Sequence, residues 1–491
     1  MAIDDRQINA LVDAVVHKLQ ARLPGAALPA RSPASSRADY VATYGARRPA
    51  IGGRGRRGIF EDVDSAVAAA RDAHEQLLEL DLETRARMIQ AMREVTSKNA
   101  EDLSRRAHEE TGLGRVEDKI QKNRLVAWKT PGIEILRPVS FTGDHGLTLV
   151  ERAPFGVISA ITPTTNPTET VLCNALGMIA GGNTVVFNVH PSAKRISRYH
   201  VEMLNDAIVA AGGPESCIAC IAEPTVESAG ELMKHQGTRL VVVTGGPAVV
   251  KAAMSSGKRA ICAGPGNPPV VVDETAHLDR AARDIVFSAS FDNNIICILE
   301  KEIFAVASIA DRLKEAMCAH GAYEVKGEAI RRLEKLVVAE DGAHPAKDWV
   351  GRDAAKIARA AGIQVPEKTR LLFAEVDPMH PFVQAELLLP VLGFSRVPTV
   401  DDGIAAALQA EHGFGHTATM HSTNIDNLSR MARAVNTSIF VKNGPALAGL
   451  GVQGEGYTSF TIASPTGEGI TTALSFTRER RCTLKDYFRI V

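Results

Sequence analysis

The chain has 491 residues, 45% of them hydrophobic and 23% charged, which is enough to bury a large core in roughly three structural units. Its 56 Lys and Arg residues nearly balance 57 Asp and Glu residues, so the net charge of −1 creates no long-range field that would attract nucleic acid or an anionic membrane. The expected partners are therefore small molecules or other protein chains.

The sequence pattern also argues against membrane insertion and secretion. No apolar run reaches the ~18 residues that a spanning helix needs. Asp4 and Asp5 occupy the region where a secretory signal would carry positive charge. The seven cysteines are too few and too scattered for a disulfide framework, which is typical of a reducing compartment. These features predict a cytoplasmic protein.

Residues 1–23 form one amphipathic helical pattern. Its apolar positions recur every three or four residues, at Ile8, Leu11, Val12, Val15, Leu19 and Leu23. Pro24 ends the pattern, and residues 24–40, rich in Pro, Ala and Ser, predict a flexible linker. An isolated helix of this length is marginally stable in water, so it needs either the protein's own core or a groove on another protein. The linker favours another protein.

From residue 155 the sequence alternates short apolar runs with helical patterns. The apolar runs cover residues 155–162, 184–188, 217–223 and 239–246, and helical patterns follow them at 167–182, 192–213, 225–236 and 247–256. This alternation predicts a doubly wound α/β domain with a parallel sheet. Ligands bind at the carboxyl ends of such strands, where helix N-termini attract anions. The turns at 188–194 and 243–247 suit that role.

The chain after Pro265 predicts a second α/β region and a surface ribbon. Helical patterns cover residues 278–290, 309–320 and 353–361. The glycines of a G-x-G-x-x-G match, Gly449, Gly451 and Gly454, do not predict a nucleotide site, because residues 457–462 read as a strand where a helix is required. The segment after residue 463 combines strand-like pieces with basic residues, which is typical of a surface ribbon.

One cysteine, Cys297, is the candidate nucleophile. It follows the end of a helical pattern and the polar sequence FDNN (residues 291–294), which is unusual for a core segment. Loops carry functional residues disproportionately, and a thiolate is strongly nucleophilic. The other cysteines are interpreted as structural: Cys217 and Cys220 in a buried strand rather than a zinc site, Cys173 and Cys318 in helix cores, and Cys262 and Cys482 without chemistry.

Three histidines, His412, His416 and His421, raise the possibility of a metal site. Gly413 and Gly415 argue against the helix that would align two of them, and no carboxylate has a ligand position nearby. A turn leading into a strand is the better interpretation, and no metal site is predicted.

Several motifs together resemble the aldehyde dehydrogenase superfamily. They are Cys297 in NNIICILEKE, Asn166 in TPTTNPT, the turn VTGGP, Glu386 in AELLLPV and the tail from Ser464. More narrowly, the chain resembles the CoA-acylating propionaldehyde and acetaldehyde dehydrogenases of bacterial microcompartments from about residue 40 to the end. Residues 1–40 resemble that group's encapsulation peptide. Any one of these motifs alone would be weak, but the set is specific.

The resemblance implies a chemical role for each matching residue. Cys297 would attack the aldehyde carbonyl to form a thiohemiacetal, and the Asn166 amide with the Cys297 N–H would hold the oxyanion. Hydride would pass to NAD, leaving an acyl thioester on Cys297. Glu386 matches the carboxylate that binds the nicotinamide ribose. The other positions that match cofactor-binding residues are Thr162, Pro163, Thr164, Thr165, His190, Pro191, Ser192, Thr244, Gly245, Gly246, Ala263 and Gly264.

One departure from the family pattern determines the expected acyl acceptor. Water-using members carry a glutamate base that opens an E-L-G-G turn, whereas residues 263–266 here read A-G-P-G. Glu300 would replace that base only if a helical turn brought it beside Cys297. Without a base, water is a poor nucleophile, but a thiol attacks through its own thiolate. Coenzyme A is therefore the expected acceptor, in a ping-pong order in which NADH leaves first.

The expected product is the acyl-CoA of a short-chain aldehyde, propanal or acetaldehyde. The preference for NAD over NADP stays open, and three alternatives remain: a hydrolytic aldehyde dehydrogenase, a reductase acting on acyl phosphates, and a non-catalytic scaffold associated with a protein shell. A CoA-dependence assay separates the first of these from the acylating enzyme. Dependence on phosphate would reveal the second, and NAD reduction excludes the third.

The implied architecture is an α/β, aldehyde dehydrogenase-like fold. It comprises a doubly wound parallel-sheet cofactor domain, a second α/β catalytic domain and a β-ribbon oligomerisation element. The expected divisions are a targeting helix (1–23), a linker (24–40), the NAD-binding domain (41–136 and 152–266), the catalytic domain (267–462) and the ribbon with its tail (137–151 and 463–491). A ribbon that pairs across subunits implies a homodimer or homotetramer. The N-terminal helix would bind a microcompartment shell protein or another lumen enzyme.

Overall fold

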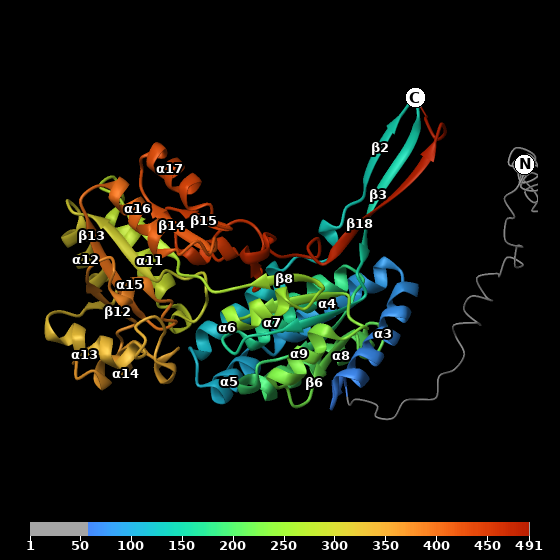
Figure 1. Cartoon of the computed structure of the whole chain (residues 1–491), viewed down its shortest axis with the longest axis horizontal. Coiled ribbons are helices and arrows are strands. Elements are labelled where there is room, and N and C mark those ends of the chain that lie inside the picture. The colour runs from blue at the N-terminus through green and yellow to red at the C-terminus, as the bar shows by residue number, and fades with distance from the viewer. Residues whose placement is uncertain (1–56, 491) are drawn as a thin grey trace, which may run out of the picture. The chain divides into compact units, whose positions relative to one another are not determined.

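A six-stranded parallel sheet organises the first half of the computed structural model, which describes residues 57–490 (Figure 1). Its strands lie in the order β1-β6-β5-β4-β7-β8. They are β1 (Ile59–Phe60), β4 (Val157–Ile161), β5 (Thr184–Asn188), β6 (Ile218–Ile221), β7 (Leu240–Thr244) and β8 (Arg259–Ala263). The doubly wound parallel sheet expected from the sequence is confirmed.

The helices of this half are α3 (Val63–Glu79), α4 (Leu82–Lys98), α5 (Ala100–Thr111), α6 (Val116–Lys129), α7 (Pro167–Ala180), α8 (Lys194–Ala210), α9 (Val226–Lys234) and α10 (Pro247–Met254). Capping side chains fix where some of them begin. Asp62 and Asp81 each accept a backbone hydrogen bond of 2.7 Å, from Ser65 N and Thr84 N, and so satisfy first-turn donors of α3 and α4.

Both faces of this sheet are covered, because its central strands are apolar on both sides. In β4, Ile158 and Ala160 pack in a core cluster with α4, α7 and α8. The alternate residues, Val157 and Ile161, pack in a second cluster with α3, α9 and α10. This division follows from the two-residue period of a strand. The sheet is therefore a rigid platform whose carboxyl-end loops are free for binding.

A seven-stranded parallel sheet organises the second half, in the order β11-β12-β13-β10-β9-β14-β15. Its strands are β9 (Pro269–Val272), β10 (Glu302–Val306), β11 (Ala322–Glu324), β12 (Leu371–Glu375), β13 (Val391–Val397), β14 (Thr417–His421) and β15 (Ile439–Lys442). The helices are α11 (Leu278–Ala289), α12 (Ala310–Ala319), α13 (Glu328–Val337), α14 (Ala354–Ala360), α15 (Pro381–Gln384), α16 (Val400–Ala410) and α17 (Ile425–Val435). The three helices predicted here correspond to α11, α12 and α14.

A three-stranded antiparallel ribbon joins distant parts of the chain (Figure 1). It consists of β2 (Val139–Gly143), β3 (Gly146–Pro154) and β18 (Thr477–Lys485), with β3 in the middle. Two short strands, β16 (Ile462–Ala463) and β17 (Gly469–Ile470), precede β18. The ribbon exposes large apolar side chains, among them Phe141 (60%) and Val139 (51%). Such exposure is typical of a surface that another chain covers.

Two predictions about local structure are wrong. Residues 457–462 are not a strand, because only Ile462 pairs, in β16, while Thr458 N and Thr461 N bond to Lys129 O and Ser459 Oγ. Cys318 is exposed rather than in a core. It follows Met317 on α12, whose buried residues recur at three- and four-residue steps, so Cys318 falls beside that stripe.

The predicted amphipathic helix at 1–23 and the linker at 24–40 lie outside the described residues. None of the helices within residues 57–490 combines the length and the apolar character needed to span a membrane.

Candidate active site

Cys297 lies in a loop that leaves α11 through three residues with left-handed backbone. Asp292, Asn293 and Asn294 have φ angles of 45°, 52° and 64°, a region that Asp and Asn tolerate better than most residue types. All three side chains are buried, so the polar FDNN segment lies inside the protein. Cys297 itself is partly exposed, unlike the three polar residues before it.

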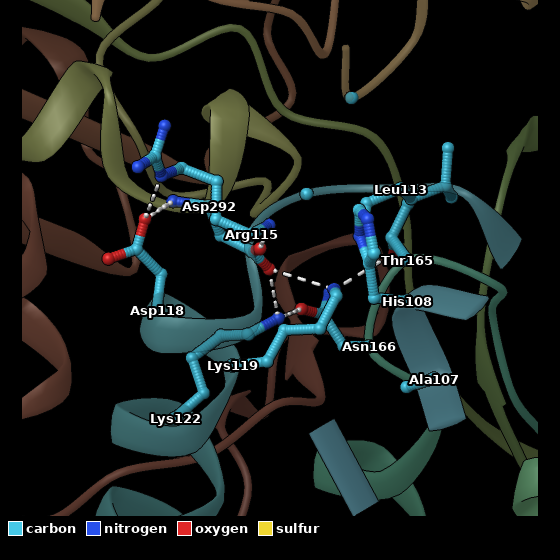
Figure 2. A network of polar contacts seen from close by, with 12 residues as sticks. Ala107, His108, Leu113, Arg115, Asp118, Lys119, Lys122, Thr165, Asn166 and Asp292 are labelled. Carbon is cyan, nitrogen blue, oxygen red and sulfur yellow. Dashed lines mark hydrogen bonds and ion pairs between the residues drawn. The ribbon is translucent and has the colours of Figure 1, made fainter. Parts of the chain in front are cut away.

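Buried hydrogen bonds hold this loop in its unusual conformation. Asp292 N donates to Asp118 Oδ2 (2.9 Å), and Asp292 Oδ1 accepts from Arg115 N (2.7 Å). The other oxygen, Oδ2, pairs with Lys119 Nζ (3.1 Å) and Lys122 Nζ (2.5 Å) (Figure 2). Burial disfavours the charged carboxylate, but the two lysines outweigh it and lower the pKa of Asp292. The loop is therefore anchored by an ionised, buried carboxylate.

Asn166 begins helix α7 without capping it. An Asn at this position usually accepts a hydrogen bond from the first turn, but here Oδ1 accepts from Lys122 Nζ at 2.7 Å. Nδ2 donates to Thr165 Oγ1 at 3.1 Å, and its second hydrogen is left for another acceptor. Figure 2 shows Lys122 reaching both Asn166 and Asp292. One ammonium thus ties the Asn166 amide to the Cys297 loop.

Gly266 allows a second loop to approach the nucleophile. A Cβ at this position would lie 3.0 Å from Cys297 O and 2.8 Å from His416 Cγ, which is too close for a side chain without movement of its neighbours. Gly266 N donates to Glu386 Oε1 at 3.3 Å. The loop after β8, the loop that carries Glu386 and the His416 ring therefore meet beside Cys297.

The surroundings of Cys297 oppose its ionisation. Burial and then the charge of Glu386 raise the pKa of the Cys297 thiol to about 12. Burial also raises the pKa of Glu386 to about 7 and lowers that of Lys301 to about 8. Burial, with the charge of Lys301, lowers the pKa of His416 to about 4. At neutral pH the resting thiol is protonated and His416 is neutral.

Lys301 is hydrogen-bonded beneath the nucleophile loop. Its Nζ donates to Asn294 O (2.9 Å) and Ile296 O (3.2 Å), and also to Asn294 Oδ1. Lys301 is buried, with 3% of its surface exposed. The carbonyl of Ile296 belongs to the peptide unit whose N–H is that of Cys297, so Lys301 touches the nucleophile's own backbone amide.

Glu300 is directed away from the role of a hydrolytic base. The chain does turn between Ile296 and Leu299, where Leu299 N donates to Ile296 O at 3.2 Å. However, Glu300 Oε1 accepts from Ala446 N at 2.7 Å, inside the packing between the loop and the 3₁₀ turn η5 (Ala446–Leu450). Burial raises the pKa of Glu300 to about 7. Its position indicates a structural role.

A Glu300→Gln variant tests this assignment through pH. A carboxyl raised from 4.5 to about 7 is protonated in the folded chain but ionised in the unfolded chain between those pH values. The contribution of this carboxyl to the free energy of unfolding is therefore fully present below pH 4.5. It falls, by up to about 3 kcal/mol, as the pH rises to 7. Glutamine has no proton to lose in this pH range. The fall in the free energy of unfolding between pH 5 and pH 8 is therefore expected to be smaller in the variant.

Urea unfolding of both proteins at the two pH values measures this difference. Turnover of aldehyde with CoA is expected to stay within about threefold of the parent, because structural substitutions away from the reacting atoms leave the barrier largely unchanged. A variant that kept the parent's pH dependence of stability, or that lost turnover selectively, would contradict the structural role.

The residues predicted to line the cofactor gather at one edge of the first sheet. Thr162, Pro163, Thr164 and Thr165 follow β4, His190, Pro191 and Ser192 follow β5, Thr244, Gly245 and Gly246 follow or end β7, and Ala263 and Gly264 end β8 or follow it. The chain runs from β4 through β5 to β6 on one side and from β7 to β8 on the other. This reversal between β4 and β7 creates the crevice in which α/β proteins bind ligands.

The chemistry of this edge fits a polar ligand such as a nicotinamide dinucleotide. The hydroxyl oxygens of Thr162 and Thr164 are buried and have no hydrogen-bond partner within residues 57–490, and buried polar groups of this kind normally have one. Burial lowers the pKa of His190, so its ring is neutral at pH 7. A Cβ at Gly246, before α10, would meet no atom within 4 Å, which leaves room for a ligand at that helix start.

Sequence reasoning missed four residues of this site: Lys119, Lys122, Lys301 and His416 as a neighbour of Cys297. The two lysines of α6 lie among Glu117, Asp118 and Arg124, a pattern that is typical of a solvated helix face. Their one hint is a spacing of three, which places both on one side of the helix. Lys301 had no such signal, because its contacts with Asn294 and Ile296 depend on an irregular loop. His416 had none because its neighbours Gly266 and Cys297 belong to other loops.

Comparison with known proteins agrees with this geometry. The model of the aldehyde dehydrogenase family matches residues 51–457. The chain is 52% identical over 439 residues to the acetaldehyde dehydrogenase (acetylating) EutE of Escherichia coli K12, covering 88% of this chain and 94% of the relative.

Solved structures give the same result. A propionaldehyde dehydrogenase of Rhodopseudomonas palustris, solved with bound CoA and an acylated cysteine, is 50% identical with a TM-score of 0.86, covering 88% of this chain and 98% of that one. A propionaldehyde dehydrogenase of the Clostridium phytofermentans fucose utilisation microcompartment is 45% identical with a TM-score of 0.87, covering 88% and 100%. Another solved relative holds NADP+.

Proposed function

The chain belongs to the aldehyde dehydrogenase family, and from this premise we propose that it oxidises a short-chain aldehyde to an acyl-CoA. One observation carries the proposal. A partly exposed cysteine, Cys297, lies in a loop tied to the Asn166 amide, while the position of the hydrolytic base holds A-G-P-G instead of a carboxylate. The site can therefore form a thioester, while residues 263–266 carry no carboxylate that could activate water against it in the way of the hydrolytic members.

The first step is attack of Cys297 Sγ on the aldehyde carbonyl. A carbon–sulfur bond forms, the thiol proton passes to solvent water, and the electron pair of the carbonyl bond moves to oxygen, which becomes an oxyanion. Asn166 Nδ2 and the Cys297 N–H are the donors that stabilise it; one donor of this kind typically lowers the barrier by about 3 to 4 kcal/mol. Because the thiol has a pKa of about 12, its proton must depart as the bond forms.

The oxyanion then collapses to a carbonyl while the hydrogen on carbon leaves as hydride. The nicotinamide dinucleotide supplies the hydride acceptor when it is bound, and the strand-end residues with Glu386 are the groups that we expect to hold it. An acyl thioester on Cys297 remains. The sulfur of a second thiol then attacks the acyl carbon, the bond from that carbon to Cys297 Sγ breaks, and the released Cys297 thiolate takes up the proton of the incoming thiol, which gives a new thioester of the same energy class. This acceptor is coenzyme A, and acyl-CoA is the product.

The test is an assay of both products. Protein, propanal or acetaldehyde, NAD or NADP, and CoA are mixed, NADH or NADPH is followed by absorbance, and acyl-CoA is identified by mass. Equal amounts of reduced nicotinamide and acyl-CoA support the proposal. Reduced nicotinamide accompanied by free acid would assign the hydrolytic reaction instead. Comparing the rates with acetaldehyde and with propanal decides which of the two is preferred. The extra methylene group of propanal changes the binding free energy by about 1 to 3 kcal/mol at most.

The assembly of the protein is proposed from its exposed apolar surfaces. The ribbon of β2, β3 and β18 carries exposed Phe141 and Leu484, and Tyr487 and Phe488 beyond it are each 71% exposed. Large exposed apolar groups of this kind mark contact surfaces. The ribbon is therefore the proposed contact of a homodimer or a homotetramer.

Residues 1–23 are proposed to direct the enzyme into a bacterial microcompartment. The apolar stripe from Ile8 to Leu23 and the Pro-rich linker support docking on a shell protein or another lumen enzyme. Deletion of residues 1–40 is expected to leave turnover of the purified protein unchanged while abolishing co-sedimentation with microcompartment shells. A full-length Leu11→Asp variant, which places a charge in the stripe, is expected to reproduce the loss. Co-sedimentation that survives both changes would refute the targeting role.

A further inference from the structure

Each donor of the proposed oxyanion hole belongs to an amide group whose oxygen accepts a hydrogen bond from a buried lysine. The donors are Asn166 Nδ2 and the Cys297 backbone N–H, and each belongs to an amide group. Lys122 Nζ donates to the oxygen of the first amide, Asn166 Oδ1, at 2.7 Å. Lys301 Nζ donates to the oxygen of the second, Ile296 O, at 3.2 Å. In both cases a lysine ammonium donates to the oxygen of the amide whose N–H is the proposed donor.

The contact of Lys122 fixes which end of the Asn166 side chain faces the substrate. A lysine ammonium has only donors, so it accepts no hydrogen from Nδ2 and requires the oxygen on its own side. The NH2 group must then point the other way. An amide turned by half a rotation would present oxygen to the oxyanion, and two negative oxygens repel. Orientation of Asn166 therefore depends on Lys122.

The two ammonium groups also strengthen the donors electronically. A positive charge at an amide oxygen draws electron density toward oxygen through the amide resonance, which leaves the N–H hydrogens more positive. Hydrogen bonds in series reinforce one another in this way, and the low polarity of a buried site enlarges the effect. Lys122 and Lys301 are 1% and 3% exposed, so bulk water does not screen either of them.

Lys122 has the charge and the support that this role needs. Burial disfavours its ammonium, but Asp292 at 2.5 Å and Glu169 at 3.2 Å outweigh burial and raise the pKa of Lys122. Asp292 lies in the loop that carries Cys297, and Glu169 lies on α7 with Asn166 at its start. The ammonium therefore bridges the two elements that must keep a fixed distance during attack.

We propose that Lys122 and Lys301 are positioning residues of the oxyanion hole, each holding and polarising the amide of one donor. The inference rests on the proposed function of Cys297 and Asn166. Neither lysine needs to touch the aldehyde. Lys122 acts through Asn166, and Lys301 acts through the peptide between Ile296 and Cys297.

Lys119 provides a matched control for Lys122. It lies one helical turn earlier on α6, is equally buried at 1% exposure, and pairs with the same oxygen of Asp292 at 3.1 Å. It makes no contact with Asn166 among the hydrogen bonds of residues 57–490. Replacing Lys119 removes a buried charge and an anchor of the loop but leaves the Asn166 amide oriented.

The experiment is a double-mutant cycle on the rate of the NADH burst in a single turnover. Lys122→Met is expected to slow the burst about 10- to 100-fold, since losing a donor outright costs about 10²- to 10³-fold. In an Asn166→Ala background the same substitution is expected to cost no more than Lys119→Met does, because only its anchoring of Asp292 is then left to lose. Lys119→Met is expected to slow the burst by the same factor in both backgrounds.

A spectroscopic reading covers both lysines. The acyl-enzyme is formed with carbonyl-labelled aldehyde, and its thioester carbonyl stretch is recorded by infrared difference spectroscopy. Donors that pull on this oxygen lower the frequency, so Lys122→Met and Lys301→Met are each expected to raise it. The rise from Lys122→Met is expected to vanish in the Asn166→Ala background and that from Lys301→Met to persist. Lys119→Met is expected to leave the frequency unchanged.

Each outcome is decisive. A burst slowed equally by Lys122→Met with and without Asn166, or a carbonyl frequency indifferent to Lys122 and Lys301, overturns the inference and leaves the proposed function standing. If Asn166→Ala itself leaves the burst unchanged, both the oxyanion role and this inference fail. If Lys122→Met does not fold, Lys122→Gln, which keeps a neutral donor, takes its place in the cycle. Its effect on the NADH burst is likewise expected to be smaller in the Asn166→Ala background than in the parent.

Discussion

The Cys297→Ala variant is expected to lose NADH formation by at least about 10⁴-fold, the scale on which removal of a catalytic nucleophile acts. Without Sγ no carbon–sulfur bond forms, and hydride transfer from an aldehyde has no tetrahedral intermediate to start from. Among the other cysteines, Cys217 lies buried directly before β6 and Cys220 lies buried within it, and burial raises the pKa of each thiol to about 12. They offer no accessible substitute.

A Cys318→Ala variant is the matched control, because this thiol is exposed on α12, outside the proposed site. Its turnover is expected to equal that of the parent. Reduced nicotinamide is followed by absorbance for both variants at equal protein concentration, with melting temperatures to show that both are folded. A burst that survives in Cys297→Ala would remove this residue from the mechanism.

Omission of CoA is expected to stop the enzyme after one turnover. Each active site should release one equivalent of NADH in a burst and then fall to a slow rate, with CoA raising steady turnover by about 10²- to 10⁴-fold, the usual worth of a general base that water here lacks. The physical reason is that residues 263–266 carry no carboxylate and that Glu300 is bound to Ala446 N. The thioester on Cys297 therefore persists until a thiol reaches it.

After the NADH burst without CoA, intact-protein mass spectrometry is expected to show an added acyl group. Digestion is expected to place this group on Cys297. Addition of CoA should remove that mass and yield acyl-CoA in the same amount. Equal rates with and without CoA, together with carboxylic acid in solution, would reveal a water-activating group within the site. The protein would then be assigned as a hydrolytic aldehyde dehydrogenase.

The sequence predicts Cys297 as the nucleophile, but the surroundings that it predicts for this residue are wrong. The prediction depends on the polar FDNN segment, which is unusual for a core. The structure shows the reverse: these residues are buried, and their polar groups hold three left-handed residues before Cys297. Buried polar side chains normally have hydrogen-bond partners, and here those partners fix the loop that carries the candidate nucleophile.

The assignment of Glu300 shows where local reasoning stops. The sequence allowed two geometries, an extended segment that points it away or a turn that brings it near Cys297. The chain makes the turn, yet the carboxylate bonds to Ala446 N. Its partner lies far along the chain, so no rule of local spacing could have found it.

The sequence by itself determined the fold class, the alternation of strands and helices over residues 155–256, the candidate nucleophile and the lack of a carboxylate at residues 263–266. These follow from residue type and from periods of two and 3.6, which are properties of neighbouring residues. Only the tertiary structure decided that Lys122 meets Asn166, that Lys301 lies beneath Ile296 and that Gly266 must be a glycine. The contacts of Lys122 and Gly266 join segments that lie far apart in the chain, and they exist only once those segments have packed together. Lys301 and Ile296 lie five residues apart, but their contact depends on the fold of the loop between them, which no regular period of strand or helix predicts.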